Sequence, residues 1–410
     1  MKILFLHKRS LFPADTGGKI RTLNVLKHLA KWHEITYLCN VLPEEEPHLA
    51  RMSDLGLNVV AIPWKEAARD SFPFYFGLAS NLLSKYPYSV NKDFDKRVRS
   101  KAIELLSNSE FNLLICDFVQ MARNVLDVGP IPKILFQHNV EAQIYRRLAD
   151  NEPNVFKRMF IRRQQLKMEA FERSAGKAFD QSIAVSPQDK QMFEEDYGWK
   201  HVTVIDTAVD TEYFRPENSD RIEGRLAFIG SMDWRPNQEG ILRFAKRVFP
   251  SIRERYPNAT LDIVGRNPPA FIKRLSSYPG VVVTGKVEDV RPYISRASMT
   301  VVPIYSGGGT RLKIFESMAM GTPVVSTPLG ADGLNIGDGK HMVCADSDQQ
   351  FADAVCKLLG SAQGRHLLAA QALKHVSQNY SSEIIAKQFN EICRMTVECG
   401  SHTRVRGKGT

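Results

Sequence analysis

The stretch VVPIYSGGGTRLKIFESMAMGTPVV, residues 301–325, places a glycine-rich segment and a helical segment between two short apolar runs. The apolar runs Thr300 to Pro303 and Val324 to Ser326 have the length and character of buried strands. A strand, a glycine loop, a helix and a second strand in this order form one unit of a parallel α/β sheet. The stretch therefore predicts an α/β fold with a ligand site at the glycine loop.

The same alternation of short apolar runs and helical segments extends through the rest of the chain. Buried strands separated by helices predict two doubly wound parallel-sheet domains, with ligand at the carboxyl ends of the strands in a cleft between them. In the first helix, residues 18–31, Ile20, Leu23, Leu26 and Ala30 recur at helical spacing, so we expect this face to lie on the sheet. The expected strands are residues 3–6, 34–39, 59–62, 113–116, 134–136, 181–185, 202–205, 226–229, 260–264, 281–284, 300–303 and 324–326.

A polar stretch interrupts this alternation near the middle of the chain. Residues 206–224 contain Pro216, Asn218 and Gly224 and predict a linker between the two domains. We expect a first domain over residues 1–205 and a second over 225–380. A helix over residues 381–400 is expected to return toward the first domain, and residues 401–410 form a polar, basic tail that is expected to be mobile.

The composition is that of a folded protein with an anionic partner. Apolar residues make up 43% of the 410 residues, which excludes a disordered chain, and the net charge of +10 favours nucleic acid, acidic lipid or phosphorylated small molecules. The six cysteines form no Cys-x-x-Cys pair, which indicates a reducing compartment. The first apolar run is too short for a signal peptide, and no stretch has the length of a membrane-spanning helix. We therefore expect a cytoplasmic protein, soluble or peripheral on the inner face of the plasma membrane.

The glycine loop has the features of an anion site. Gly307, Gly308 and Gly309 carry no side chains, so backbone N–H groups can approach a ligand, and the helix that follows offers its own N-terminal donors. Arg311 and Lys313 place two positive charges in the first turn, where the helix dipole disfavours cations, so an anion such as a diphosphate is expected to compensate them. A flexible loop with solvated charges is the alternative.

Three further positions are candidate ligand contacts. Glu316 has apolar neighbours, so we expect a partly buried carboxylate that accepts hydrogen bonds from ribose hydroxyls; a surface pair with Lys313 is the alternative. His138 follows the strand 134–136 and is expected to hydrogen-bond a hydroxyl or stabilise charge, although a capping or core histidine is equally compatible with its position. Gly17 and Gly18 form a second backbone-donor candidate at a strand-to-helix junction.

Several common chemistries find no support in the sequence. The pairs Asp93 and Asp95, and Asp346 and Asp348, have the spacing of a metal–diphosphate site but read as helix starts or turns, so no metal is expected. The chain has no Gly-x-Gly-x-x-Gly fingerprint, no Gly-x-Ser-x-Gly elbow and no Walker loop. The sequence therefore gives no support to the enzyme classes that carry these motifs on α/β folds.

Four segments together carry a family resemblance. They are GSMDWRPNQEG (residues 230–240), LDIVG (261–265), VTGKVEDVRPY (283–293) and GTRLKIFESMAMGTPVV (309–325). With these segments the chain resembles the family-4 retaining glycosyltransferases of GT-B fold, the glycosyl transferases group 1. Among them it most resembles the sugar transferases associated with bacterial exopolysaccharide and exosortase gene systems. The resemblance implies two Rossmann-like domains that face a central cleft, with the acceptor on the first domain and the nucleotide-sugar donor on the second.

The resemblance also implies roles for individual residues. Gly18 would contact donor phosphate or acceptor, His138 the transferred sugar, and the backbone near Val287 the base. Arg311 and Lys313 would hold the diphosphate, and Glu316 the ribose. The expected catalytic residues are His138, Arg311 and Lys313, and the expected donor-binding residues are Gly17, Gly18, Gly230, Ser231, Arg235, Val287, Gly307, Gly308, Gly309, Thr310 and Glu316. The nucleotide sugar is a substrate, UDP- rather than GDP-linked, and no cofactor is expected.

The chain departs from the family pattern at three positions. Gly308 stands where many members carry the first of two glutamates eight residues apart. Ser231 and Asn237 stand near the places of an arginine and a lysine that neutralise the diphosphate. Arg311, Lys313 or Arg235 would then have to supply that charge.

Other functions remain open at this level. In the family, transfer is thought to occur on the front face of the donor, with the leaving diphosphate helping to deprotonate a glycan or lipid-linked acceptor. A nucleotide-sugar 2-epimerase and a non-catalytic nucleotide-sugar-binding scaffold are the alternatives, and nucleic acid is not an expected partner. The basic residues of 146–177 and the aromatic residues Phe72, Phe74, Tyr75 and Phe76 suggest an anionic membrane surface as a partner; a solvated helix beside a core segment is the alternative.

Overall fold

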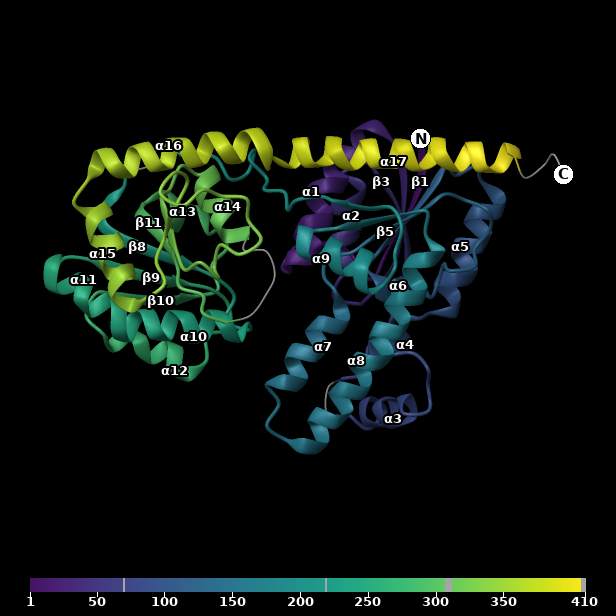
Figure 1. Cartoon of the computed structure of the whole chain (residues 1–410), viewed down its shortest axis with the longest axis horizontal. Coiled ribbons are helices and arrows are strands. Elements are labelled where there is room, and N and C mark those ends of the chain that lie inside the picture. Colours follow the sequence, from purple (N-terminus) through teal and green to yellow (C-terminus); the bar gives the residue numbers. More distant parts are fainter. Residues whose placement is uncertain (69–70, 218–219, 307–311, 407–410) are drawn as a thin grey trace. The chain divides into compact units, whose positions relative to one another are not determined.

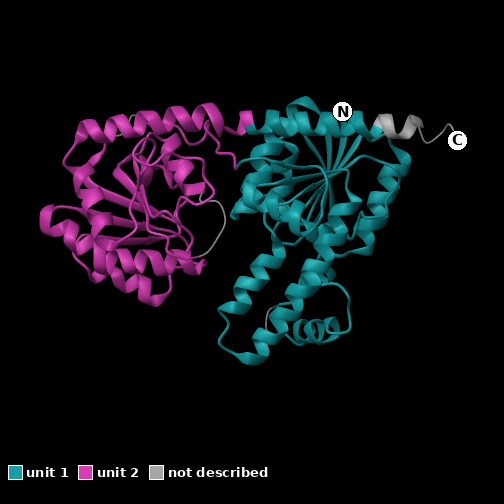
Figure 2. Cartoon of the chain, viewed as in Figure 1, with its two compact units in different colours: residues 1–206, 385–410 teal, residues 207–384 magenta. Residues whose placement is uncertain are grey.

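The chain forms two compact units (Figure 2), unit 1 with residues 1–206 and 385–410 and unit 2 with residues 207–384. The computed structural model describes residues 1–68, 71–217, 220–306 and 312–406, with side chains as far as residue 400. The segment 206–224, expected as a linker, belongs to unit 2 from Thr207 onward, and the first strand of that unit begins within it, at Ile222.

Unit 1 is built on a parallel sheet (Figure 1) that has seven strands within the described residues, in the order β3-β2-β1-β4-β5-β6-β7. Every strand expected from the apolar runs is present, because such runs bury both faces in a sheet covered by helices. The strands are β1 (Lys2–His7), β2 (Glu34–Val41), β3 (Leu57–Pro63), β4 (Leu113–Asp117), β5 (Lys133–Phe136), β6 (Gln181–Ala184) and β7 (Val202–Val204).

The helices of unit 1 differ from expectation in two places. The expectation for α1 is only partly met, because Leu26 is buried but Ile20, Leu23 and Ala30 are only partly so, and the buried residues include Arg21, Thr22 and Asn24. The basic stretch expected as one long helix is two helices, because Pro153 interrupts it and the Asn154 side chain caps the second by accepting from the Lys157 N–H. The helices are α1 (Gly17–Trp32), α2 (Leu49–Ser53), α3 (Phe72–Asn81), α4 (Tyr88–Asp93), α5 (Lys96–Asn108), α6 (Val119–Ala122), α7 (Glu141–Asp150), α8 (Val155–Ala175) and α9 (Pro187–Gln191).

Unit 2 repeats the arrangement of unit 1 with a six-stranded parallel sheet among the residues described, in the order β10-β9-β8-β11-β12-β13. Its strands are β8 (Ile222–Ile229), β9 (Thr260–Val264), β10 (Val281–Gly285), β11 (Ala297–Val302), β12 (Val324–Ser326) and the two-residue β13 (Val343–Cys344), which the apolar pattern does not predict. Its helices include α10 (Arg235–Arg243), α11 (Phe249–Arg255), α12 (Ala270–Lys273), α13 (Arg291–Ser295), α14 (Leu312–Ala319), α15 (Asp348–Leu359) and α16 (Ala362–Asn379). A π-helical segment, η4 (Phe244–Val248), joins α10 to α11.

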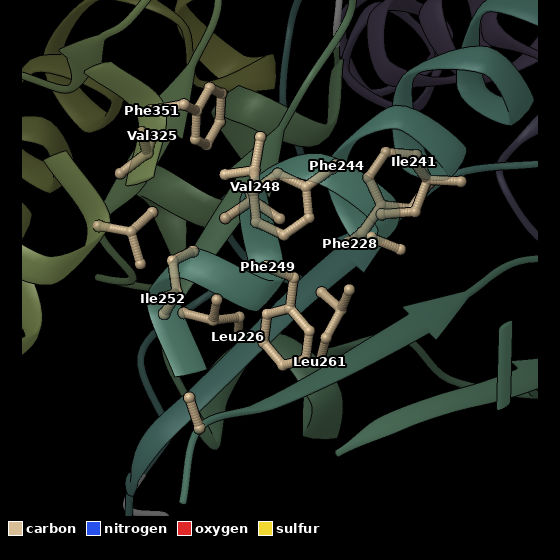
Figure 3. Close-up of a cluster of buried hydrophobic side chains, with 14 of the residues drawn as sticks. Leu226, Phe228, Ile241, Phe244, Val248, Phe249, Ile252, Leu261, Val325 and Phe351 are labelled. Atoms are coloured by element: carbon tan, nitrogen blue, oxygen red, sulfur yellow. The ribbon is translucent and has the colours of Figure 1, made fainter. Parts of the chain in front are cut away.

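One of the core clusters of unit 2 contains residues of its sheet and of the helices that cover it (Figure 3). Leu226 and Phe228 of β8 pack with Phe244 of η4 and Phe249 of α11, all fully buried or nearly so. This packing holds the strand end that carries Gly230 against α10.

One member of each aspartate pair lies at a helix start. The Asp95 carboxylate accepts a hydrogen bond from the Arg97 N–H and caps α5. Asp348 is the first residue of α15, which Ser347 caps. Asp93 instead ends α4, and its buried carboxylate lies 2.7 Å from Lys8 Nζ. The prediction of helix starts is therefore confirmed for Asp95 and Asp348.

The last helix, α17 (Ser382–Arg406), joins the two units in the sequence. The ring of Phe389 packs on Phe136 of β5 with centroids 5.2 Å apart, and Asn390 Oδ1 lies 2.6 Å from His33 Nε2. The helix continues past the expected start of the tail at residue 401, and residues 407–410 lie outside the described residues. Among the helices described, none combines the length and the apolar character needed to span a bilayer.

Candidate functional site

Each sheet has a point where the order of the strands reverses. In unit 1 this point lies between β1 and β4, and in unit 2 it lies between β8 and β11. In open α/β sheets, ligands bind at the carboxyl ends of the strands at such a point. Most of the candidate residues follow strands that border these two points.

Lys313 occupies the switch point of unit 2, in the first turn of α14. Its ammonium donates a hydrogen bond to Asn237 Oδ1 of α10 at 2.8 Å and lies 4.5 Å from the centre of the Phe228 ring. A Cβ at Gly230 would come within 2.7 Å of Lys313 Nζ. The glycine after β8 therefore leaves space for the ammonium, and Asn237 orients it.

The loop after β8 is held by its own hydrogen bonds. Asn237 Nδ2 donates to the Ser231 carbonyl at 2.8 Å, and the Ser231 hydroxyl donates to Asp233 Oδ2 at 2.9 Å. Asp233 also accepts from Arg266 Nε at 2.9 Å. Ser231 and Asn237 thus shape the loop through these hydrogen bonds.

Glu316 lies one turn after Lys313 on the same face of α14. Its half-buried carboxylate makes no hydrogen bond to the described residues, and burial raises its pKa to about 7 against the opposing effect of Lys313. The ammonium of Lys313 donates to Asn237, and its charge also acts on Glu316 by lowering the pKa of that carboxyl. A half-buried carboxylate in this position can accept hydrogen bonds from a ligand.

The remaining unit 2 candidates divide into three groups. Val287 follows β10 at the same sheet edge and is half-buried. Arg235 is exposed and paired with Glu239, with 2.6 Å between Arg235 Nε and Glu239 Oε1. Gly307, Gly308, Gly309, Thr310 and Arg311 lie outside the described residues.

His138 and Asp117 form the centre of a buried polar cluster at the switch point of unit 1. His138 follows β5, and its Nε2 lies 2.5 Å from Oδ1 of Asp117, the last residue of β4. The Thr22 hydroxyl donates to Asp117 Oδ2 at 2.6 Å, and His7 Nε2 lies 3.5 Å from the same oxygen. One carboxylate therefore joins residues from β1, α1, β4 and the loop after β5.

The protonation states follow from these contacts. Burial raises the pKa of Asp117, but the neighbouring His138, His7 and Thr22 outweigh it and hold the pKa below its ordinary value. Burial lowers the pKa of His138, although Asp117 opposes this effect. Both lowered pKa values favour an ionised Asp117 beside a neutral His138, whose Nε2–H donates to the carboxylate.

Both ring nitrogens of His138 are engaged within the protein. Nδ1 lies 3.1 Å from Nη1 of Arg21, which donates to it when Nε2 carries the proton. The side chain is only 3% exposed. His138 is thus a core histidine with satisfied nitrogens, one of the two roles open at the level of sequence, and its contact with a transferred sugar stays a prediction.

Phe118 packs on the cluster in a strained backbone conformation. Its φ is +68°, which is rare for a bulky residue, and its ring stacks on His138 with centroids 4.1 Å apart. A Cβ at Gly18 would come within 2.6 Å of the Phe118 ring, whereas a Cβ at Gly17 would meet nothing within 4 Å. Gly18 therefore makes room for the aromatic ring that covers His138.

Sequence reasoning missed Asp117, Arg21 and Thr22. Asp117 has a recognisable signal, since it is a polar residue that directly ends a buried apolar run. Arg21 and Thr22 have no such signal, because only the packing of α1 turns them toward the sheet.

The comparison with known families agrees with the geometry of unit 2. Residues 223–361, all within unit 2, match the family model for glycosyl transferases group 1. The chain is a glycosyltransferase whose unit 2 contains a region that matches group 1. This match covers both strands at the switch point and the helix that carries Lys313 and Glu316.

Two curated proteins similar to the glycosyltransferase illustrate its relatives. An uncharacterized 44.6 kDa protein in the cps region of Klebsiella pneumoniae is 22% identical over 407 residues, 95% of this chain and 98% of that protein. A D-inositol 3-phosphate glycosyltransferase of Corynebacterium urealyticum is 26% identical over 220 residues, 47% of this chain and 51% of that enzyme.

Solved structures show the fold of the glycosyltransferase. Sucrose-phosphate synthase of Thermosynechococcus elongatus has a TM-score of 0.69 at 15% identity, covering 97% of this chain and 99% of that one. The Anabaena protein HepE, solved in complex with UDP and glucose, has a TM-score of 0.66 at 14% identity, covering 96% and 100%. The predicted GT-B class, two doubly wound parallel-sheet domains, is confirmed.

Proposed function

We propose that the enzyme transfers a sugar, with retention of configuration, from a UDP-sugar to a glycan or lipid-linked acceptor. The proposal rests on the position of Lys313 and Glu316, which lie on one face of α14 at the switch point of unit 2. A cation held by Asn237 suits a diphosphate, and a half-buried carboxylate without a described hydrogen bond suits ribose hydroxyls.

In this proposal unit 2 binds the donor nucleotide. The ammonium of Lys313 stabilises the diphosphate charge, together with Arg311 and the backbone of residues 307–310 as the sequence predicts. The backbone of Gly230 and Ser231 contacts the phosphates, and the backbone near Val287 contacts the base. The proposal includes neither a metal nor a cofactor.

The transfer step needs charge stabilisation and accurate placement. The bond between the anomeric carbon and the diphosphate oxygen breaks while the acceptor hydroxyl adds to the same face of the sugar. The hydroxyl proton passes to the leaving diphosphate oxygen. Stabilising the charge on that oxygen is the main contribution that Lys313 makes in this scheme.

The choice of UDP and of a glycan product draws on the relatives. HepE binds UDP in its solved complex, and the Klebsiella protein of the cps region matches almost the whole chain. A cytoplasmic enzyme is consistent with six free cysteines among the described residues. A lipid-linked acceptor would suit an enzyme that is peripheral on the inner face of the plasma membrane.

Calorimetric titration with UDP and with GDP tests the nucleotide site. We expect UDP to bind more tightly than GDP, and Lys313→Ala and Glu316→Ala to weaken that binding. Lys246→Ala, which removes an exposed lysine of η4, serves as the control and should leave it unchanged.

Each negative result favours a different alternative function. No binding of either nucleotide would favour a scaffold without donor binding. Nucleotide-sugar binding without transfer to any acceptor would favour a non-catalytic protein. Conversion of the donor sugar without acceptor, detected as proton exchange at the sugar, would favour a 2-epimerase.

A further inference from the structure

Unit 1 carries a helical element with a concentration of exposed apolar side chains. In Figure 1, α7 and α8 lie side by side and extend away from the sheet of unit 1, with α3 beside α8. Phe72 of α3 is 82% exposed, Leu83 just after α3 is 95% exposed, and Phe156 of α8 is 83% exposed. We call residues 72–83 and 155–167 the apolar tip.

The α3 part of the apolar tip contains no charged residue. Asn81 fastens it to α8, since its Oδ1 accepts from Gln164 Nε2 at 2.9 Å and its carbonyl accepts from Lys167 Nζ at 2.6 Å. The rings of Phe72 and Phe76 stack on each other, with centroids 6.2 Å apart, and both are exposed. The exposed aromatic face therefore belongs to an anchored helix and not to a loose end.

The α8 part of the apolar tip has exposed apolar side chains of its own. Phe156, Met159 and Leu166 are exposed and recur at helical spacing, so they share one face of α8. The opposite face is buried on unit 1 through Gln164 and Met168. An apolar face on the outside of a helix that is already packed needs a further partner to cover it.

The charge on the α8 part of the apolar tip is positive, although Arg162 is paired with Asp150 of α7. Residues 155–167 contain no acidic residue and five basic ones, Lys157, Arg158, Arg162, Arg163 and Lys167. Basic side chains flanking exposed aromatic and aliphatic ones are the pattern of a helix that lies in the interface of an anionic bilayer. A second copy of the chain would bring two positive surfaces together, which is unfavourable.

We propose that the apolar tip inserts into the interfacial region of an anionic lipid bilayer and binds the enzyme to the membrane surface. Phe72, Phe76, Leu83 and Phe156 enter the boundary between headgroups and acyl chains. Lys157 and Arg158 meet the anionic headgroups. The inference goes beyond the proposed transfer reaction, because it rests only on this surface of unit 1.

Co-sedimentation of the full chain with lipid vesicles tests the proposal without donor or acceptor. We expect binding to vesicles of phosphatidylcholine with phosphatidylglycerol, little binding to phosphatidylcholine alone, and release at high salt. The double variant Phe72→Ser/Phe76→Ser should weaken binding about tenfold or more. Lys157→Gln/Arg158→Gln should weaken it by about fivefold for each charge removed.

Matched controls come from unit 2. Leu367→Ser removes an apolar side chain of α16 that is 59% exposed, and Lys273→Gln/Arg274→Gln removes two exposed basic residues. Neither control should change vesicle binding. All the substituted side chains are exposed, so the thermal midpoints of the variants should match that of the wild type.

Three results would overturn the proposal. Wild-type protein that stays in the supernatant with anionic vesicles removes the membrane as the partner. Binding that persists in both tip variants assigns it to another surface. A lipid-free dimer, detected by sedimentation velocity and dissociated by the phenylalanine variant, makes a second copy the occupant. Nucleotide binding is measured separately, so its failure would leave this result unaffected.

Discussion

At the scale of single residues, Lys313 is the cation that the structure places at the switch point of unit 2. Because Asn237 orients it beside the glycine after β8, Lys313→Ala removes a preorganised charge from the donor site. We expect turnover with a UDP-sugar to fall about a hundredfold while the fold is retained. Initial rates and a thermal melt check both halves of the prediction, with Lys246→Ala as the control. Unchanged turnover would contradict the proposed role.

The raised pKa of Glu316 leads us to expect that a rise in pH lowers the stability of the fold and strengthens the binding of UDP. Its folded pKa of about 7 lies above the ordinary value of 4.5, so its ionisation lowers the stability of the fold as pH rises from about 4.5 to about 7. Glu316→Gln should therefore become more stable relative to the wild type across that range, as urea denaturation can measure. Ribose hydroxyls favour the ionised carboxylate, so UDP affinity should rise through about pH 7 in the wild type only. A parallel pH dependence in both proteins would contradict this role of Glu316.

We expect the substitution Asp117→Asn to lower the stability of unit 1. The buried, ionised carboxylate accepts hydrogen bonds from His138 and Thr22, with His7 Nε2 3.5 Å away, and Asp117→Asn removes its charge. We expect the free energy of unfolding to fall by about 3 kcal/mol, measured by urea denaturation above pH 5 or so. Its folded pKa is lowered, so this contribution is present above the ordinary pKa and lost as pH falls through the folded value.

Asp127→Asn is the matched control for Asp117→Asn. Asp127 is exposed and paired with Arg99, so its loss should cost less than about 1 kcal/mol. Equal effects of the two substitutions would mean that the buried cluster adds nothing to the stability of unit 1.

At the scale of secondary-structure elements, the close approach of α10 to the end of β11 positions Asn237. A Cβ at Gly240 would lie 1.9 Å from the carbonyl oxygen of Pro303. Gly240→Ala should therefore lower stability by about 1–3 kcal/mol, although alanine ordinarily stabilises a helix. Gly17→Ala, where a Cβ meets nothing within 4 Å, should leave the thermal midpoint unchanged or raise it. A stabilised Gly240→Ala would show that α10 can shift without cost.

The apolar tip shows where element-level sequence reasoning succeeds and where it stops. The basic and aromatic residues of this region are visible in the sequence, whereas the break between α7 and α8 at Pro153 and Asn154 was not expected. The exposure of Phe72 and Phe156 is not visible, because an isolated helical pattern does not reveal which face another helix covers.

At the scale of the whole molecule, the last helix stabilises the first unit. Phe389 is fully buried against Phe136, although it follows all of unit 2 in the sequence. We expect Phe389→Ala to cost about 3–5 kcal/mol and to accelerate amide hydrogen exchange in β5 while leaving β8 unchanged. Met395→Ala, at a position of the same helix that is 55% exposed, is the control. Faster exchange in β8 alone would contradict the assignment of α17 to unit 1.

The sequence by itself determined every described strand except β13, and with the strands the two α/β units. Each strand depends on neighbours within a few residues, because an apolar run of the right length is visible in the sequence. The same local information places Lys313 and Glu316 three residues apart on one helix face.

Only the tertiary structure decided the polar cluster of unit 1 and the partner of Lys313. Thr22 reaches Asp117 across 95 residues, Arg21 reaches His138 across 117, and Lys313 reaches Asn237 across 76. Such contacts depend on the strand order, which sets β1 beside β4 and β8 beside β11. Burial and protonation follow from that order, because a side chain is desolvated by residues that lie near it in space and far from it in the sequence.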